Sequence, residues 1–119
     1  MSPAQLAFFR QRLVEEEASL RAAASETTSH LQENEAEPDP NDRASSEEEH
    51  TIELRVRDRE RKLLKKIQKA LARIDDGSYG WCEETGEPIG IARLLARPTA
   101  DLCIEAQERH ELKERQFGG

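Results

Sequence analysis

Aromatic residues and long hydrophobic runs are both scarce in this chain of 119 residues. The residues are 4% aromatic and 35% hydrophobic but 36% charged, so a large globular core is not expected. No apolar run approaches the roughly 18–20 residues that a membrane-spanning helix needs. The N-terminus lacks the basic and apolar segments of a signal peptide. Together with the presence of two cysteines, these features favour a reduced, cytoplasmic protein.

The net charge of −7 is divided unevenly along the chain. Residues 1–50 carry −8, residues 51–75 carry +5 and residues 76–119 carry −4. Because phosphate neutralisation dominates DNA affinity, an acidic chain is not expected to bind DNA by itself. The basic segment instead predicts pairing with the acidic first segment or docking on an acidic protein surface.

Apolar residues recur at steps of three, four or seven in two long segments, which predicts two amphipathic helices. The first seam comprises Leu6, Phe9, Leu13, Leu20, Ala24, Thr27 and Leu31, and the second comprises Ala44, Thr51, Leu54, Arg61, Leu64, Ile67, Leu71 and Ile74. Pro3 fits a helix start, and the two prolines at 38 and 40 separate the helices. We expect Asp42 to cap the second helix and Gly77 to terminate it.

Two long helices joined by a short proline turn predict an antiparallel coiled-coil hairpin. The expected fold is therefore mainly α. The hairpin spans residues 1–76, with its tip at about 34–43, and a small head spans residues 77–119. A C-terminal helix is expected from Thr99 to about Gln116. The apolar material expected to hold the head is Tyr79, Trp81, Ile89, Ile91, Leu94, Leu95, Leu102 and Ile104.

The head contains half of a zinc-ribbon pattern. Cys82 and Cys103 each begin a Cys-x-x-Cys spacing, but Thr85 and Ala106 occupy the second positions. A structural zinc site needs four ligands, so we expect no stable zinc, and His110 is interpreted as a surface histidine in preference to a third ligand. Three interpretations stay open: a ribbon that has dispensed with metal, cysteines that pack as small apolar side chains, or a redox pair that forms a disulfide.

The predicted tip carries two acidic residues, Asp39 and Asp42. Both fit ordinary turn chemistry, since aspartate is common beside proline and at helix N-caps. They also fit a negatively charged probe that acts near a bound cation. No third catalytic group accompanies them, so we do not expect an enzyme.

Three segments together resemble the TraR/DksA family of bacterial transcription factors: PDPNDRASSEEE, ELRVRDRERKLLKKIQKAL and DDGSYGWCEETGEPIGIARLLARPTADLC. The resemblance runs from about Ala4 to about Gln116. It implies a factor that binds RNA polymerase and not DNA, and whose hairpin enters the secondary channel. It further implies that this factor destabilises open promoter complexes together with the alarmone ppGpp.

The resemblance also implies roles for individual residues. The family's tip motif falls on Asp39, Asp42 and Ala44. A polymerase-docking arginine matches Arg59, and residues lining the ppGpp site match Lys66 and Arg97, whose cationic groups suit phosphates.

Two departures from the family pattern carry further implications. The set Cys82, Thr85, Cys103 and Ala106 resembles cysteine-poor, zinc-independent members, which suggests a role when zinc is scarce. Gln107 stands where the family often has a lysine, which implies a weaker response to ppGpp. The alternatives are a secondary-channel factor that promotes transcript cleavage, and a structural coiled coil or homodimer. A monomer is the expected state.

Overall fold

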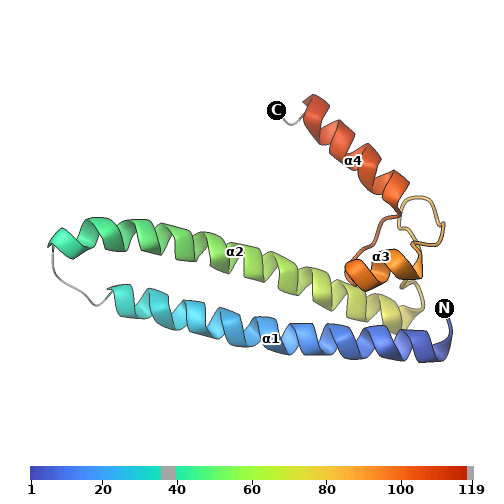
Figure 1. The fold of residues 1–119 in the computed structure, drawn as a ribbon, viewed down its shortest axis with the longest axis horizontal. Helices are drawn as coiled ribbons and strands as arrows, with labels where there is room; N and C mark the ends of the chain where they lie inside the picture. Colours follow the sequence, from blue (N-terminus) through green and yellow to red (C-terminus); the bar gives the residue numbers. More distant parts are fainter. Residues whose placement is uncertain (36–39, 118–119) are drawn as a thin grey trace. The chain divides into compact units, whose positions relative to one another are not determined.

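Over the residues that it describes, the computed structural model contains four helices: α1 (Pro3–Glu35), α2 (Pro40–Asp76), α3 (Ile91–Ala96) and α4 (Ile104–Phe117) (Figure 1). It describes the backbone of residues 1–35 and 40–117, and the side chains of residues 1–27, 29 and 47–116. The one strand-like pairing in these ranges is an isolated antiparallel bridge between Trp81 and Pro88. The predicted mainly α fold is therefore confirmed. No helix in the described ranges is long and apolar enough to cross a membrane.

The outer ends of the two long helices follow the sequence signals. At the start of α1, the Gln5 backbone N–H donates to the Ser2 hydroxyl (3.2 Å) and the Ser2 nitrogen donates to the Gln5 side chain (2.9 Å), which is a reciprocal capping box. At the end of α2, Gly77 has a φ of 85°. This left-handed conformation lets the N–H groups of Ser78 and Tyr79 both reach the Arg73 carbonyl.

Two predicted helix starts were wrong. Helix α2 begins at Pro40, not after an N-cap at Asp42, because proline lacks the N–H that the first helical position leaves unbonded. Helix α4 begins at Ile104, not at Thr99. The preceding segment is held outside a helix because the Glu83 N–H donates to the Asp101 carbonyl (2.9 Å).

The chain forms two compact units. The arm unit is residues 14–67, and the head unit is residues 1–13 together with residues 68–119. Within the arm unit, α1 and α2 run side by side in opposite directions, which gives the predicted hairpin (Figure 1). The division into domains 1–76 and 77–119 stays a prediction, because the compact units divide both long helices instead.

The seam of the arm unit differs from the predicted one on α2. Thr51, Leu54 and Arg61 are exposed, although all three were expected to face α1. Of the arm side chains that the structure describes, two are buried: Ile67 and Glu60. The polar residue Glu60 therefore lies in the seam, at a position that the apolar periodicity of the sequence did not include.

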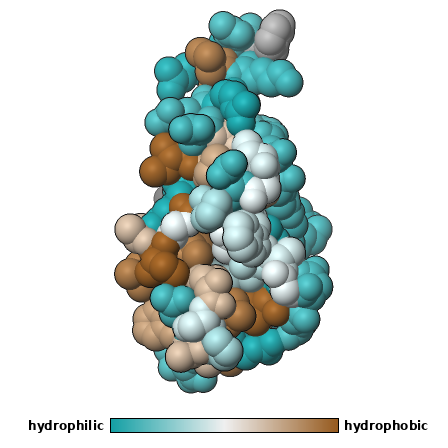
Figure 2. Space-filling view, turned by 90° about the vertical axis from the view of Figure 1, so that its right-hand side faces the viewer, coloured by the Kyte–Doolittle hydropathy of each residue, from teal (hydrophilic) through white to brown (hydrophobic). Residues whose placement is uncertain are grey.

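The head unit has a small apolar core that includes the start of α1. Phe9 lies against Tyr79, with ring centroids 5.8 Å apart, and the Tyr79 hydroxyl donates to the Pro98 carbonyl (2.8 Å). The buried apolar residues of this unit are Phe9, Leu13, Ala70, Ile74, Tyr79, Cys82, Ile89, Leu94, Ala100 and Ala106. Of the apolar residues expected to hold the head, Tyr79, Ile89 and Leu94 are buried, whereas Trp81, Ile91, Leu95 and Ile104 are exposed. Figure 2 shows hydrophobic side chains gathered among hydrophilic ones on one face.

Candidate functional site

The tip residues predicted to act in the site lie largely outside the described residues. Asp39 falls in the undescribed segment. Asp42 and Ala44 belong to the first turns of α2, but their side chains are not among those described. The role of the tip therefore stays a prediction.

The outward face of α2 in the arm unit combines apolar and cationic side chains. Ile52, Val56, Arg59, Leu63 and Lys66 follow one another at steps of four, three, four and three, so they share one face of the helix, here called the outer stripe. All five are exposed, and Ile52 has 58% of its surface accessible. The family resemblance implies binding roles for Arg59 and Lys66. Both therefore lie on one surface with three apolar side chains.

Neighbouring charges on α2 are paired away from the outer stripe. Asp58 binds Lys62 (2.9 Å) and Arg61 (2.6 Å) along the same helix. The side-chain hydrogen bond from Lys62 is the main cause that lowers the pKa of Asp58. The side chain of Arg59 makes no hydrogen bond or ion pair to another described residue, so its guanidinium is available to a partner.

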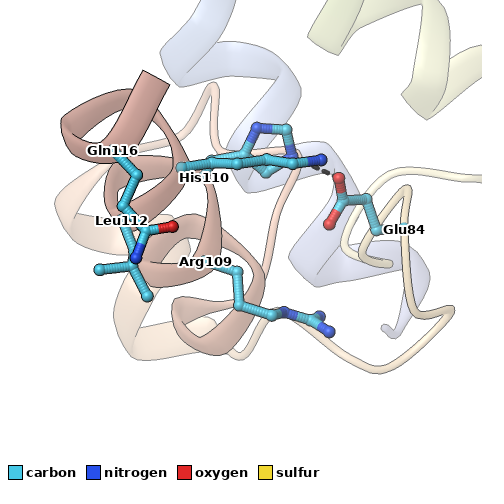
Figure 3. Close-up of a pocket in the computed structure, with 6 residues that line it drawn as sticks. Glu84, Arg109, His110, Leu112 and Gln116 are labelled. Carbon is cyan, nitrogen blue, oxygen red and sulfur yellow. Dashed lines mark hydrogen bonds and ion pairs between the residues drawn. The ribbon is translucent and has the colours of Figure 1, made fainter. Parts of the chain in front are cut away.

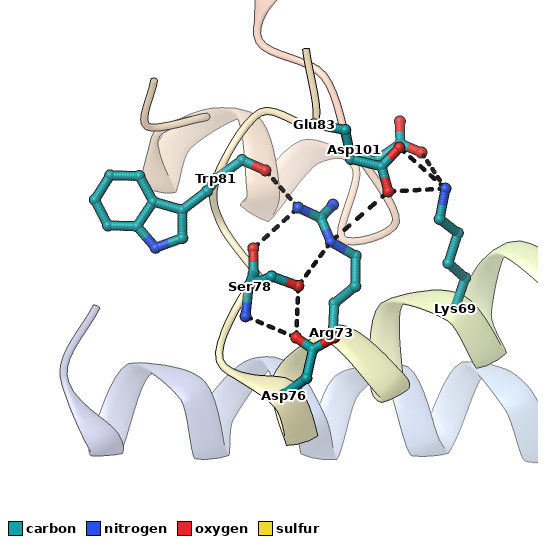
Figure 4. A network of polar contacts seen from close by, with 7 residues as sticks. All are labelled: Lys69, Arg73, Asp76, Ser78, Trp81, Glu83 and Asp101. Carbon is teal, nitrogen blue, oxygen red and sulfur yellow. Dashed lines mark hydrogen bonds and ion pairs between the residues drawn. The ribbon is translucent and has the colours of Figure 1, made fainter. Parts of the chain in front are cut away.

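The first loop of the head unit is tied to the last turns of α2 by a polar network (Figure 4). Arg73 is buried and donates to the carbonyls of Ser78 (2.9 Å) and Trp81 (2.5 Å). Lys69 bridges Glu83 (2.9 Å) and Asp101 (3.2 Å), and the hydrogen bond that Lys69 donates to Glu83 is the main cause that raises the pKa of Lys69. These contacts fix the position of the loop that contains the ribbon pattern.

Three of the four ribbon positions, Cys82, Thr85 and Cys103, lie close together. Cys82 and Ala106 are buried, Cys103 is half-buried and Thr85 is exposed. The Thr85 hydroxyl lies 3.9 Å from the Cys103 sulfur. Within the first knuckle, Gly86 has a φ of 73° and its N–H donates to the Cys82 carbonyl (3.0 Å), which closes the turn.

The Cys82 sulfur lies in a cradle of hydrogen-bond donors. Burial raises the pKa of its thiol, but this effect is outweighed by the Thr85 hydroxyl and by the backbone N–H groups of Cys103, Thr85 and Glu84. Together these donors lower the pKa to about 6, because hydrogen bonds to the thiolate favour the charged form. No pattern in the sequence predicts this shift, since no basic residue flanks the thiol.

These residues do not fit a structural zinc ion. Two cysteine sulfurs are present, but the hydroxyl of Thr85 is a weak ligand and the methyl group of Ala106 is none. Among the described residues there is no group of three or more His, Cys, Asp or Glu side chains that could hold a metal. The donor set is therefore short of the four ligands that a zinc ribbon requires.

His110 pairs with Glu84, and this pair lies at the edge of an open pocket of about 360 Å³ (Figure 3). The pocket is lined by Glu84, Arg109, His110, Leu112, Lys113 and Gln116. His110 is exposed, which agrees with its interpretation as a surface histidine.

The two residues assigned to ppGpp fall in different units. Lys66 is exposed in the arm unit, and Arg97 is exposed in the head unit, where it follows α3. In α4, the Gln107 side chain donates to Glu111 (3.3 Å) and contributes no positive charge.

Sequence reasoning missed three residues that organise these surfaces: Lys69, Arg73 and Glu60. Charge pairing between distant segments leaves no periodic signal, so the network around Arg73 has no signature in the sequence. Glu60 was missed because a carboxylate is not expected in a seam.

Two family models match the chain. The model described as "DnaK suppressor protein DksA, N-terminal domain" matches residues 5–74, and "Prokaryotic dksA/traR C4-type zinc finger" matches residues 77–112. The second description names four cysteines, of which this chain has two.

Named relatives agree with these models. The chain is 57% identical to the RNA polymerase-binding transcription factor DksA of Caulobacter vibrioides, over 97% of this chain and 82% of that protein. It is 51% identical to the protein of the same name from Escherichia coli strain K12, over 100% of this chain and 80% of that protein. The solved structure of transcription factor DksA2 from Pseudomonas aeruginosa is similar, with a TM-score of 0.90 at 50% identity over 97% of this chain and 89% of that one. This chain belongs to the DksA family.

Proposed function

We propose that this protein binds bacterial RNA polymerase directly and regulates transcription. The hairpin enters the secondary channel and destabilises open promoter complexes, with the cytoplasm as its place of action and a monomer as its active state. The observation that carries this proposal is the outer stripe. Two relatives named as RNA polymerase-binding transcription factors support it.

The outer stripe has the chemistry of a protein-binding surface. Its three apolar side chains, Ile52, Val56 and Leu63, keep 41–58% of their surface exposed, so covering them with a partner adds hydrophobic stabilisation that folding leaves unused. Arg59 adds a planar group with several donors, which suits carboxylates on the partner. An acidic and apolar surface of polymerase is therefore the partner that this stripe fits.

Comparison of Arg59→Ala with Arg57→Ala tests the docking surface. Both arginines are exposed, but they are two residues apart and so lie on opposite sides of α2. We expect Arg59→Ala to weaken polymerase binding by about tenfold, equivalent to about 1.4 kcal/mol, and Arg57→Ala to leave it unchanged. Equal losses in the two variants would mean that general positive charge, not the stripe, drives binding.

The tip acids Asp39 and Asp42 are proposed to perturb polymerase elements near the active-site Mg²⁺ and not to perform chemistry. Asp42→Asn should lengthen open-complex lifetime relative to the unmodified protein at a ribosomal RNA promoter, while binding affinity is retained. The unmodified protein should cause no release of dinucleotide from a backtracked polymerase complex. Release that depends on Asp42 would favour the alternative of a transcript-cleavage factor.

The alarmone ppGpp is proposed as a co-effector held by Lys66 and Arg97 together with polymerase. Basic side chains suit its phosphates. Lys66→Ala and Arg97→Ala should each reduce the extra effect of ppGpp on open-complex lifetime, with a smaller change in the effect of the protein alone. Gln107→Lys should increase the ppGpp effect, because it restores one positive charge. An unchanged response in all three variants would remove these residues from the site.

Activity is proposed to be independent of zinc, because the ribbon positions supply two strong ligands and not four. Open-complex lifetime should be shortened equally with and without a strong zinc chelator, and the far-ultraviolet circular dichroism spectrum should be unchanged. If the chelator abolished the shortening of open-complex lifetime or changed the spectrum, Cys82 and Cys103 would be shown to recruit a metal. A factor of this kind would serve a cell that is short of zinc.

A further inference from the structure

The arm unit contains a polar contact where a coiled coil normally has apolar packing. Glu60 is 9% exposed, and its Oε1 lies 3.0 Å from the Thr27 hydroxyl on α1. Its second oxygen, Oε2, is buried and has no hydrogen-bond partner. A buried acceptor without a partner destabilises the fold, so apolar packing would hold this position better.

The Thr27 hydroxyl faces two acceptors and has a single proton. Its oxygen lies 3.1 Å from the Ala23 carbonyl and 3.0 Å from Glu60. When the proton goes to Glu60, the contact between the helices is a hydrogen bond to a carboxylate. Glutamine at position 60 would bring an N–H of its own and would satisfy Thr27 without competing with Ala23.

The apolar part of this seam does little to define how the helices are aligned. Residues 22–24 of α1 are three successive alanines, which offer no large side chain to fit a matching hole. Ile67 is the one buried apolar side chain among those described in the arm unit. Within the arm unit, a displacement of α1 by one helical turn would therefore cost little in apolar contacts; the other end of α1 is held by Phe9 and Leu13, which are buried in the core of the head unit.

The polar contact distinguishes the observed alignment from a displaced one. If Ala24, the preceding seam residue, moved opposite Glu60, neither carboxylate oxygen would have a hydroxyl donor. A polar residue at one seam position is known to set the register of coiled coils at a cost in stability. Leucine at position 60 would pack against alanine or threonine alike and would not discriminate.

We propose that Thr27 and Glu60 form a register pair that fixes the axial alignment of α1 and α2 in the arm unit. The link to activity rests on the proposed function: Arg59 of the outer stripe is the neighbour of Glu60 in α2. Glu60 is thus a positioning residue. It determines how α1 is aligned with the outer stripe of α2.

The test measures the distance between two spin labels in the full chain. Ser19 and Arg57 are each replaced by a non-natural amino acid that carries a ketone. The ketone reacts with the spin label, so Cys82 and Cys103 stay unmodified. Both sites are exposed in the arm unit. The two sites are offset along the hairpin axis, so a one-turn displacement changes their separation by about 5 Å. Double electron–electron resonance then reports whether the distance between the labels has one population or two.

Three variants separate register from stability. Glu60→Gln should keep one distance and the unmodified protein's alignment. Glu60→Leu should raise the melting temperature, by about 5 °C, yet show a second distance. Thr27→Val should lower the melting temperature, because it leaves Glu60 without its donor. A single unchanged distance in Glu60→Leu, or a loss of stability in that variant, would overturn the register pair.

Polymerase binding is measured on the same proteins as a separate readout. Glu60→Gln should bind and act as the unmodified protein does. Glu60→Leu should bind but destabilise open complexes several-fold less well, despite its higher melting temperature. Full activity in a Glu60→Leu protein with two distances would refute the positioning role and leave the register pair intact. Absence of polymerase binding by the unmodified protein would instead refute the proposed function, while the distance measurement stands by itself.

Discussion

Replacing Arg73 with methionine tests whether one buried guanidinium holds the first loop of the head unit on α2 (Figure 4). Methionine retains an apolar stem but removes the donors to the Ser78 and Trp81 carbonyls. A hydrogen bond from a charged donor contributes about 1.5–3 kcal/mol, so the loss of two should reduce the free energy of unfolding by about 3–6 kcal/mol. The total free energy of unfolding of a unit of this size is roughly 3–10 kcal/mol, so the effect should be severe.

Lys69→Met is the matched control, because it removes a cation from the same network. Lys69 also contacts two groups, Glu83 and Asp101, but about half of its side chain is exposed. Solvent screening limits such pairs to about 0–1 kcal/mol. Urea unfolding is followed by fluorescence of Trp81, the sole tryptophan, which lies in the head unit.

Salt dependence sharpens the comparison. The Lys69 contribution should fall in high salt, whereas the buried contacts of Arg73 to carbonyl oxygens should persist. Similar losses of stability in the two variants would refute the distinction between buried and exposed cations in this network. So would a loss below about 1 kcal/mol in Arg73→Met.

Two further predictions concern the first knuckle. Since the folded pKa of Cys82, about 6, is below the ordinary thiol value of about 8.5, the thiolate stabilises the fold at high pH, and this contribution falls as the pH drops from about 8.5 and is lost below about 6. The difference in urea midpoint between the unmodified protein and Cys82→Ser should therefore shrink across that range, and a difference that grows on acidification would contradict the cradle. Gly86→Ala should cost about 1 kcal/mol, because φ is 73° while no atom obstructs the added methyl group; an unchanged unfolding midpoint would show that this turn tolerates a side chain.

The sequence predicted those parts of the fold that depend on local signals. Pro3 and Gly77 mark the outer ends of the hairpin because their backbone preferences act within one turn. The start of α4 could not be predicted in this way. No proline or glycine stands between Thr99 and Ile104 to mark a later start, but a backbone hydrogen bond from Glu83, distant in sequence, holds Asp101 outside a helix.

The candidate site was predictable to a similar extent. The exposed positions of Arg59, Lys66 and Arg97 agree with their predicted binding roles, although those roles stay predictions. The cradle around Cys82 depends largely on backbone N–H groups, which are present in every sequence and therefore leave no sequence pattern. Glu60 was hidden because periodicity analysis treats every carboxylate as solvent-facing, whereas this one is buried against α1.

The composition of the head unit has a consequence for how the chain is made. Residues 1–13, with Phe9 and Leu13 in the core, are synthesised first, but their partners after residue 67 follow only when the whole arm has left the ribosome. The arm unit can form as soon as residue 67 emerges. The head unit must wait until its residues 68–119 have emerged as well. A fragment that starts at Gly77 would lack part of its own core, so the ribbon cannot be moved to another protein as a self-contained module.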